Sequence, residues 1–308
     1  YMWVALPPVS EQTTIVRFLN YTDRCIRRYI LAKQKLIKLL EEQKQGIIHH
    51  VVTRGLDPNV RLKPSGIEWL GDVPEHWDVR RNGRLFSQRN ETGFADLPIL
   101  EVSLRTGVRI RNFENSDRKQ VMSDRDKYKR AVSGDIAYNM MRMWQGAVGV
   151  TPTDGLISPA YVVARPLPGT EPRYFIRLFR TAAYMTEIDK YSRGIVKDRN
   201  RLYWEDFKRM PSCYPPPHEQ VKIADAIDKE CNDIDTIVDR IHREIELLHE
   251  YRTRLIADVV TGKLDVREAA AQIPEVVEET EPLDEASELP ESNGAEESRL
   301  VLEELTDE

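Results

Sequence analysis

The segment NMMRMWQGAVGV, residues 139–150, brings together side chains that can hydrogen-bond to the edges of DNA bases. Guanidinium and amide groups match two atoms of a guanine or an adenine at once in the major groove. The segment lies between two strand-like runs, and Gly146 favours a turn there. The alternative is structural, with the methionines and the tryptophan in a core and the arginine as a surface charge. The candidate base-contacting residues are Asn139, Arg142, Trp144 and Gln145.

A second segment, YSRGIVKDRNRLYWEDF at residues 191–207, concentrates positive charge around a glycine. Lys and Arg neutralise phosphates whatever the base sequence, so such a cluster favours contact with a nucleic-acid backbone. The alternative is a solvated loop. The predicted phosphate-contacting residues are Arg193, Lys197, Arg199, Asn200 and Arg201.

A third segment, SLRTGVRIRNF, carries arginines at the alternation of a strand. Successive side chains of a strand point to opposite faces, so Arg105, Arg109 and Arg111 are expected on one face. That face lies either along DNA or in water.

Catalytic motifs are absent from the sequence. It contains no GxxxxGK[ST] phosphate loop, no GxGxxG after a strand, no HExxH, and no Asn/Asp-Pro-Pro-aromatic tetrad of the kind that amino-methyltransferases use. The six histidines are scattered, and we interpret each as a solvated or core residue. We therefore predict a chain without catalytic residues and without a bound cofactor.

The three cysteines, Cys25, Cys213 and Cys231, form no CxxC pair, which argues against a zinc site and against a disulfide framework. Their number fits a reducing, cytoplasmic compartment. The two that fall in the helical runs described below are expected to be small buried hydrophobes.

The candidate residues lie in a stretch of about 145 residues, 66–213, whose net charge is about +6. Short strand-like runs (LPILEVSL, GDIAYNM, GAVGV, AYVVARP) precede a helical pattern, PRYFIRLFRTAAYMTEIDKY. This mixed order predicts an α+β domain.

Two copies of one pattern flank that domain. LPPVSEQTTIVRFLN starts at Leu6 and YPPPHEQVKIADAID at Tyr214, at a constant offset of 208 residues. Proline and glutamate suit the first turn of a helix. We predict helices over about 12–52 and 220–260, each roughly 60 Å long at 1.5 Å per residue.

Apolar residues recur every seven positions in both helices, which predicts an antiparallel coiled coil between them. The second helix has Ile234, Ile241 and Leu255 in this seam, and the first has Ile26 and Ile37. Residues 7–56 carry a net charge of +5 and residues 215–264 a net charge of −4, which favours pairing with each other. The alternative is that the charges solvate two separately packed helices. Polar residues interrupt the seam at Asp23, Lys33, Lys44 and Arg252.

The formal net charge of −6 is unevenly distributed. Residues 266–308 carry fifteen acidic and two basic side chains, so residues 1–265 are basic. The acidic stretch is poor in aromatic residues and is expected to be a disordered tail that solvates the protein or shields a basic surface.

The order of these motifs resembles the DNA specificity subunit of type I restriction–modification systems, in which two target-recognition domains alternate with two long helices. The resemblance rests on the two Pro-Pro-x-x-Glu-Gln motifs, on VVTRGLD and VVTGKLD at the helix ends, and on IEWLGDVPEHWDVRR at the start of the domain. It covers about residues 1–265.

The resemblance implies a non-catalytic subunit in which each recognition domain reads half of a bipartite site in double-stranded DNA. It implies that the helices dock methyltransferase subunits, which bind S-adenosylmethionine and methylate adenine. A restriction and translocase subunit that uses ATP and Mg²⁺ joins them to cut unmethylated DNA.

The resemblance also implies the domain limits. Residues 7–56 and 214–265 are the long helices, 57–213 the target-recognition domain, and 266–308 the tail. Residues 1–6 correspond to the end of a preceding recognition domain, because Met2 matches Met210 in the repeat. We therefore expect a truncated or fragmentary chain, or a half-subunit that associates with a second copy. The alternatives are the recognition part of a fused restriction–methyltransferase polypeptide and a coiled-coil scaffold without sequence-specific DNA binding.

Overall fold

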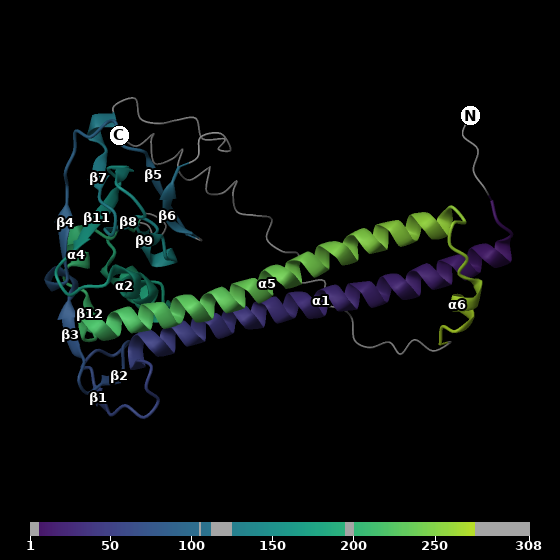
Figure 1. Cartoon of the computed structure of the whole chain (residues 1–308), viewed down its shortest axis with the longest axis horizontal. Helices are drawn as coiled ribbons and strands as arrows, with labels where there is room; N and C mark the ends of the chain where they lie inside the picture. The colour runs from purple at the N-terminus through teal and green to yellow at the C-terminus, as the bar shows by residue number, and fades with distance from the viewer. Residues whose placement is uncertain (1–5, 105, 112–124, 195–199, 275–308) are drawn as a thin grey trace. The chain divides into compact units, whose positions relative to one another are not determined.

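The computed structural model describes residues 6–104, 106–111, 125–194 and 200–274. Two long helices, α1 (Val9–Arg54) and α5 (Pro217–Val260), flank a part of the chain that contains short strands and helices (Figure 1). The predicted α+β class is thereby confirmed. The chain divides into two compact units, residues 1–42 with 232–308 and residues 43–231.

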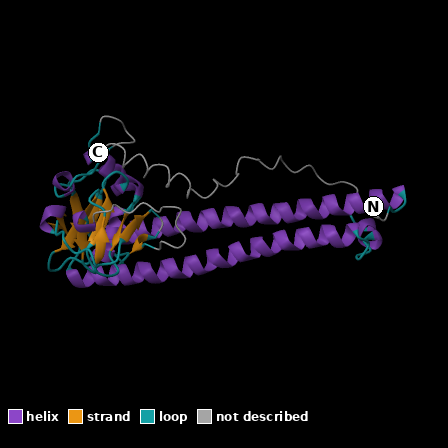
Figure 2. Cartoon of the chain, turned by 90° about the horizontal axis from the view of Figure 1, so that it is seen from above, coloured by secondary structure: helices purple, strands orange, loops and turns teal. Residues whose placement is uncertain are grey.

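In the first unit, α1 and α5 pack side by side in antiparallel orientation, as both views show (Figures 1 and 2). Near the start of α1, Ile15, Phe18 and Leu19 contact Leu255 and Val259 near the end of α5. Much of the predicted seam is buried: Ile26, Ile30 and Ile37 on one helix, and Ile234, Ile241, Leu255 and Val259 on the other. Leu40 and Leu248, which continue the same heptads, are half-buried.

Three of the four polar residues that interrupt this seam pair with charges on the opposite helix. Asp23 of α1 forms an ion pair with Arg252 of α5, and Lys33 forms one with Glu244. Each pair matches one position on both helices, so these contacts favour a single register.

One expectation for the cysteines of the helices was wrong. Cys25 is exposed, because it precedes the seam residue Ile26 and so points about 100° away from it, whereas Cys231 is buried as predicted. The segment that we expected to be a tail from residue 266 begins with a short helix, α6 (Arg267–Ala271), whose Val266 and Ala270 are buried. Arg17 donates to the carbonyl oxygen of Ile273 at 2.8 Å. Residues 275–308 lie outside the described residues.

The second unit is built on a four-stranded antiparallel sheet in the order β4-β11-β8-β9. Its strands are β4 (Phe86–Arg89), β11 (Tyr161–Pro166), β8 (Ile136–Asn139) and β9 (Val148–Val150). Four two-stranded pairs accompany it: β1 (Leu62–Pro64) with β2 (Asp72–Pro74), β3 (Asp78–Arg81) with β12 (Pro211–Tyr214), β5 (Leu100–Ser103) with β6 (Gly107–Ile110), and β7 (Lys129–Ala131) with β10 (Gly155–Ile157).

Three short α-helices, α2 (Pro172–Phe179), α3 (Ala182–Tyr191) and α4 (Trp204–Phe207), pack with this sheet. Helix α2 starts where Pro172 follows Glu171, whose carboxylate accepts from the backbone N–H of Arg173. One face of α2 buries Phe175 and Phe179, and Phe175 meets Phe86 of β4 edge to face with ring centroids 5.3 Å apart. The core of the unit is therefore aromatic.

The ends of the long helices belong to this core. Val52 near the end of α1, and Ile223 and Ile227 near the start of α5, are buried in it. The Tyr174 hydroxyl donates to the carbonyl oxygen of Val52 at 2.8 Å, which fixes the last turn of α1 to α2. No helix in the described ranges is long and apolar enough to span a bilayer.

Candidate nucleic-acid interface

The 139–146 turn connects β8 to β9, and four of its residues hold its shape. Asn139 is buried, and its side-chain oxygen accepts from the backbone N–H of Met141 at 2.8 Å. Met143 is fully buried, and the indole N–H of Trp144 donates to the Met141 carbonyl oxygen at 3.0 Å. Gly146 ends the turn in the left-handed region at φ 88°, which favours glycine. Met143 and Trp144 therefore act mainly as structural residues of the turn, as the alternative interpretation predicted.

Arg142 and Gln145 are the two side chains of the 139–146 turn that remain available to a ligand. The Arg142 Nε donates to the Gln145 side-chain oxygen at 2.8 Å, and Gln145 is exposed. This bond pre-orients the pair and leaves the terminal guanidinium nitrogens of Arg142 and the amide nitrogen of Gln145 as donors. Donors of this kind match acceptors on purine edges.

The 193–201 loop is closed by a backbone bridge. Arg193 and Arg201 exchange two N–H to O=C bonds of 3.0 and 2.9 Å, and both residues are exposed. The Arg193 guanidinium is held by the buried carboxylate of Asp206, and Asn200 donates to Asp189 at 3.4 Å. Of the predicted phosphate contacts, Arg201 thus presents its charge most freely among the described residues. Lys197 and Arg199 lie outside the described residues.

The third predicted segment is the β5–β6 hairpin, residues 100–110. Arg109 is exposed, and its Nε lies 2.6 Å from the carboxylate of Glu101, the residue opposite it in the register. An exposed ion pair of this kind contributes about 1 kcal/mol or less, so the arginine can exchange partners readily. Arg111 follows the strand, is half-buried, and donates its backbone N–H to Ile99. Arg105 lies outside the described residues.

These three segments contact one another in the second unit. The sequence analysis did not predict these contacts. The Leu202 N–H donates to the Met140 carbonyl oxygen at 2.8 Å, which joins the end of the 193–201 loop to the 139–146 turn. The hairpin reaches the same region because Gly149 of β9 lies against Gly107 of β6, where a Cβ at 149 would stand 2.5 Å from the Val108 nitrogen. The resulting cluster of segments carries Arg109, Arg142, Gln145, Arg193 and Arg201.

A further arginine, missed by the sequence analysis, links two of these segments. Arg180 follows α2 and donates to the carbonyl oxygens of Gly146 at 3.0 Å and Leu104 at 2.6 Å. Burial and the nearby Arg177 lower the pKa of its guanidinium from an already high value, so it stays charged at neutral pH. One arginine at the end of an amphipathic helix gave no signal that could distinguish it from a surface charge.

Several other arginines of the second unit are committed to ion pairs. Arg89 lies 2.7 Å from the buried carboxylate of Asp135, and the pKa of Arg89 is raised because its bonds to Asp135 and Glu91 outweigh its burial. Arg130 contacts Asp154 at 3.0 Å. The positive composition of this part of the sequence therefore overstates the charge that is free to meet phosphates.

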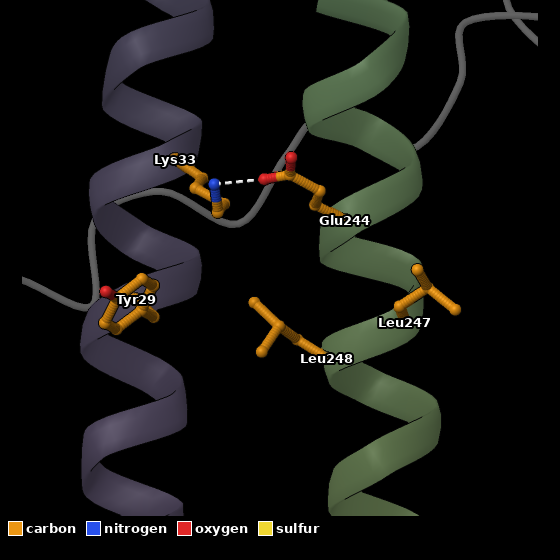
Figure 3. Close-up of a pocket in the computed structure, with 5 residues that line it drawn as sticks. All are labelled: Tyr29, Lys33, Glu244, Leu247 and Leu248. Atoms are coloured by element: carbon orange, nitrogen blue, oxygen red, sulfur yellow. Dashed lines mark hydrogen bonds and ion pairs between the residues drawn. The ribbon is translucent and has the colours of Figure 1, made fainter.

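The helix pair of the first unit carries a second candidate surface. Tyr29 and Lys33 of α1 and Glu244, Leu247 and Leu248 of α5 line a shallow groove of about 320 Å³ (Figure 3). Tyr29 is 66 % exposed and Leu247 is 55 % exposed. Further exposed apolar residues continue at helical spacing: Leu36 and Leu39 on α1, and Ile237 and Tyr251 on α5. Apolar side chains exposed in a row on paired helices are typical of a docking surface for another helix.

Within the described ranges, no cluster of three or more His, Cys, Asp or Glu side chains could hold a metal ion.

Comparison with known proteins gives a fold. No protein-family model matches the sequence. A structure of the type I R-M system, described for its complex assembly and conformational transition, aligns with a TM-score of 0.61 at 15% identity, over 85% of this chain and 62% of that chain. The crystal structure of the HsdS subunit from Thermoanaerobacter tengcongensis aligns with a TM-score of 0.50 at 17% identity, over 85% of this chain and 60% of that one.

The protein therefore has the fold of an HsdS subunit of a type I R-M system, and it spans about three fifths of the length of the matched chains. This fold agrees with the resemblance carried by the repeated proline motifs.

Proposed function

We propose that this chain is the non-catalytic DNA specificity subunit of a type I restriction–modification system. The observation that carries the proposal is the meeting of the 139–146 turn, the 193–201 loop and the β5–β6 hairpin on a fold shared with an HsdS subunit. The arginine and glutamine side chains of these segments supply both the base-edge donors and the phosphate-neutralising charges that a DNA-reading surface needs.

In this proposal, the second unit reads one half of a bipartite site. Arg142 and Gln145 contact base edges, and the 193–201 loop with its Lys197 and Arg199 contacts phosphates. Arg105, Arg109 and Arg111 of the hairpin segment extend the contact along the backbone. Asn139 and Trp144 act by shaping the 139–146 turn, since their polar atoms already have partners within it.

The helices, in this proposal, dock methyltransferase subunits through the groove around Tyr29 and Leu247. The complex then gains its restriction and translocase subunit. S-adenosylmethionine, ATP and Mg²⁺ serve those partners, and this chain binds none of them. A second copy of the chain would supply the second half-site reader.

Gel-shift titration of the methyltransferase subunits on a duplex library, with and without this chain, tests the proposal. We expect a shifted complex that needs the chain and survives competition by unrelated DNA. The isolated chain, given S-adenosylmethionine, ATP and Mg²⁺, should neither methylate nor cleave DNA. Turnover that a point mutation in this chain abolishes would contradict the proposal, as would equal DNA binding without the chain.

The docking surface has its own test. Leu247→Asp should weaken binding to the methyltransferase subunits by about tenfold or more, because it places a charge in an apolar contact. Ile256→Asp is the matched control, since Ile256 is also an exposed apolar residue of α5 but does not line the groove. Neither variant should lower the melting temperature appreciably. Equal loss of binding by both variants would place the partner elsewhere.

A further inference from the structure

Arg180 occupies the C-cap of α2, and its backbone N–H donates to the carbonyl oxygens of Ile176 and Leu178 in the last turn. A cation at this end of a helix interacts favourably with the helix dipole. The side chain then leaves its own helix and donates to Gly146 in the 139–146 turn and to Leu104 in the β5–β6 hairpin. One guanidinium thus connects a helix to two segments that the proposed function assigns to DNA contact.

The contact with the 139–146 turn is close. A Cβ atom at position 146 would lie 3.3 Å from the Met185 sulfur and 3.8 Å from the Arg180 Cγ. Gly146 therefore allows the turn to approach both Arg180 and helix α3. The planar guanidinium fixes the directions of its donors, so the two carbonyl oxygens are held at a defined separation.

The charge of Arg180 is balanced by dipoles. In the described part of the chain, no carboxylate forms an ion pair with it, and its polar contacts are the two carbonyl oxygens. Its donors are directed at backbone carbonyl oxygens, so binding a phosphate would require these two hydrogen bonds to break.

Helix α2 is itself fixed to the first turns of α5 within the same unit. Arg173 contacts Asp225 and Arg177 contacts Asp228, each at 2.8 Å, and the Gln220 side chain accepts from the Glu171 N–H at 2.8 Å. Movement of the 139–146 turn relative to the start of α5 therefore requires either α2 or Arg180 to yield.

We infer that Arg180 is a positioning residue that sets the geometry of the base-reading turn and the backbone-contacting hairpin relative to the start of α5 without touching DNA. The inference rests on the proposed function. It assigns Arg180 to discrimination between sequences and not to overall affinity, because misplaced donors lose base contacts while phosphate contacts persist.

The test compares Arg180→Met and Arg180→Lys in the full chain, assembled with methyltransferase subunits. The probes are a preferred duplex, enriched by the wild-type complex from a randomised library, and a scrambled duplex of equal composition. For Arg180→Met, we expect the ratio of the two affinities to fall by about tenfold or more. Affinity for the scrambled duplex and the slope of affinity against salt should stay unchanged. Arg180→Lys keeps the charge but should not restore the ratio, since an ammonium lacks the fixed fork.

Arg165→Met is the matched control, because it removes an exposed arginine of β11 whose Nε bonds to Ser87 and leaves both carbonyl contacts of Arg180 in place. Its affinity ratio should equal that of the wild type. Hydrogen exchange supplies a second readout: peptides spanning 100–107 and 141–147 should exchange faster in Arg180→Met, while peptides of α2 stay protected. Faster exchange over α2 would indicate a folding defect in Arg180→Met. The affinity ratio of Arg180→Lys then tests the inference instead.

Each failure has a distinct signature. Full discrimination in both Arg180 variants would overturn the inference and leave the proposed function intact. A reduced salt slope would also overturn it, because Arg180 would then be a phosphate contact. A wild-type complex that enriches no sequence would refute the proposed function itself.

Discussion

At the scale of single residues, the 139–146 turn separates side chains that build the site from side chains that face a ligand. Arg142→Ala should weaken binding to the preferred duplex by about 1–3 kcal/mol and relax the preference at one base pair, because it removes base-edge donors. Arg165→Ala is the control, since Arg165 is an exposed arginine on β11 whose Nε bonds to Ser87. Selection from a randomised library measures both effects. If Arg142→Ala weakens preferred and scrambled duplexes equally, the turn does not read bases.

Arg201 should behave differently from Arg142. It is exposed beside the bridge that closes the 193–201 loop, in a position suited to phosphates. Arg201→Ala should weaken binding to all duplexes alike and reduce the slope of log K against log salt by about one unit. Salt titrations by fluorescence anisotropy give this slope. A change confined to the preferred duplex would instead make Arg201 a base contact.

The cysteines test the packing of single residues. Burial raises the pKa of the Cys213 thiol to about 12, and Cys25 is exposed. Near neutral pH, iodoacetamide should therefore modify Cys25 and spare Cys213 until the protein unfolds. Because the folded pKa of Cys213 lies above its ordinary value of 9.0, this thiol stabilises the fold below about pH 9 and loses that contribution as pH rises toward 12. Equal labelling of both thiols in the native protein would show that the junction of α1, α2 and β12 opens readily.

At the scale of elements, the heptad pattern predicts the pairing of α1 with α5. Comparing a buried with an exposed isoleucine of the same helix tests this pairing. Ile241 is 5 % exposed and Ile237 is 45 % exposed on the same helix. Ile241→Asp should destabilise the protein by several kcal/mol, roughly, because it buries an unpaired charge, whereas Ile237→Asp should be nearly neutral. Thermal melts followed by circular dichroism compare them. Equal melting temperatures for the two variants would contradict the pairing of α1 with α5.

The elements also show what a sequence can and cannot predict. Local periodicity was sufficient for α1 and α5, since each seam repeats over many turns and the two helices carry complementary charge. It also placed the turn at Gly146, where a left-handed backbone requires glycine. The meeting of the turn, loop and hairpin depends on contacts between distant positions, such as Leu202 with Met140, and no local pattern encodes them. Cys25 was misplaced because a one-residue shift on a helix changes the face by about 100°.

At the scale of the whole molecule, the proposed function assigns DNA reading to the second unit and partner docking to the helix pair. We propose that the segments that meet at the 139–146 turn select the DNA sequence and that the helix pair binds the methyltransferase subunits. In this division, the helices influence affinity for the partner, and the arginines of the second unit influence the sequence that is chosen and the affinity for DNA. Substitutions such as Leu247→Asp and Arg142→Ala should therefore change different observables.

The central claim is that this chain decides which DNA sequence the complex acts on. Mapping of methylated adenines in plasmid DNA, after incubation with the methyltransferase subunits, S-adenosylmethionine and this chain, tests it most directly. The account predicts methylation at one defined motif with the wild-type chain, none without the chain, and a motif degenerate at one base pair with Arg142→Ala. The same set of methylated sites with and without the chain would contradict it.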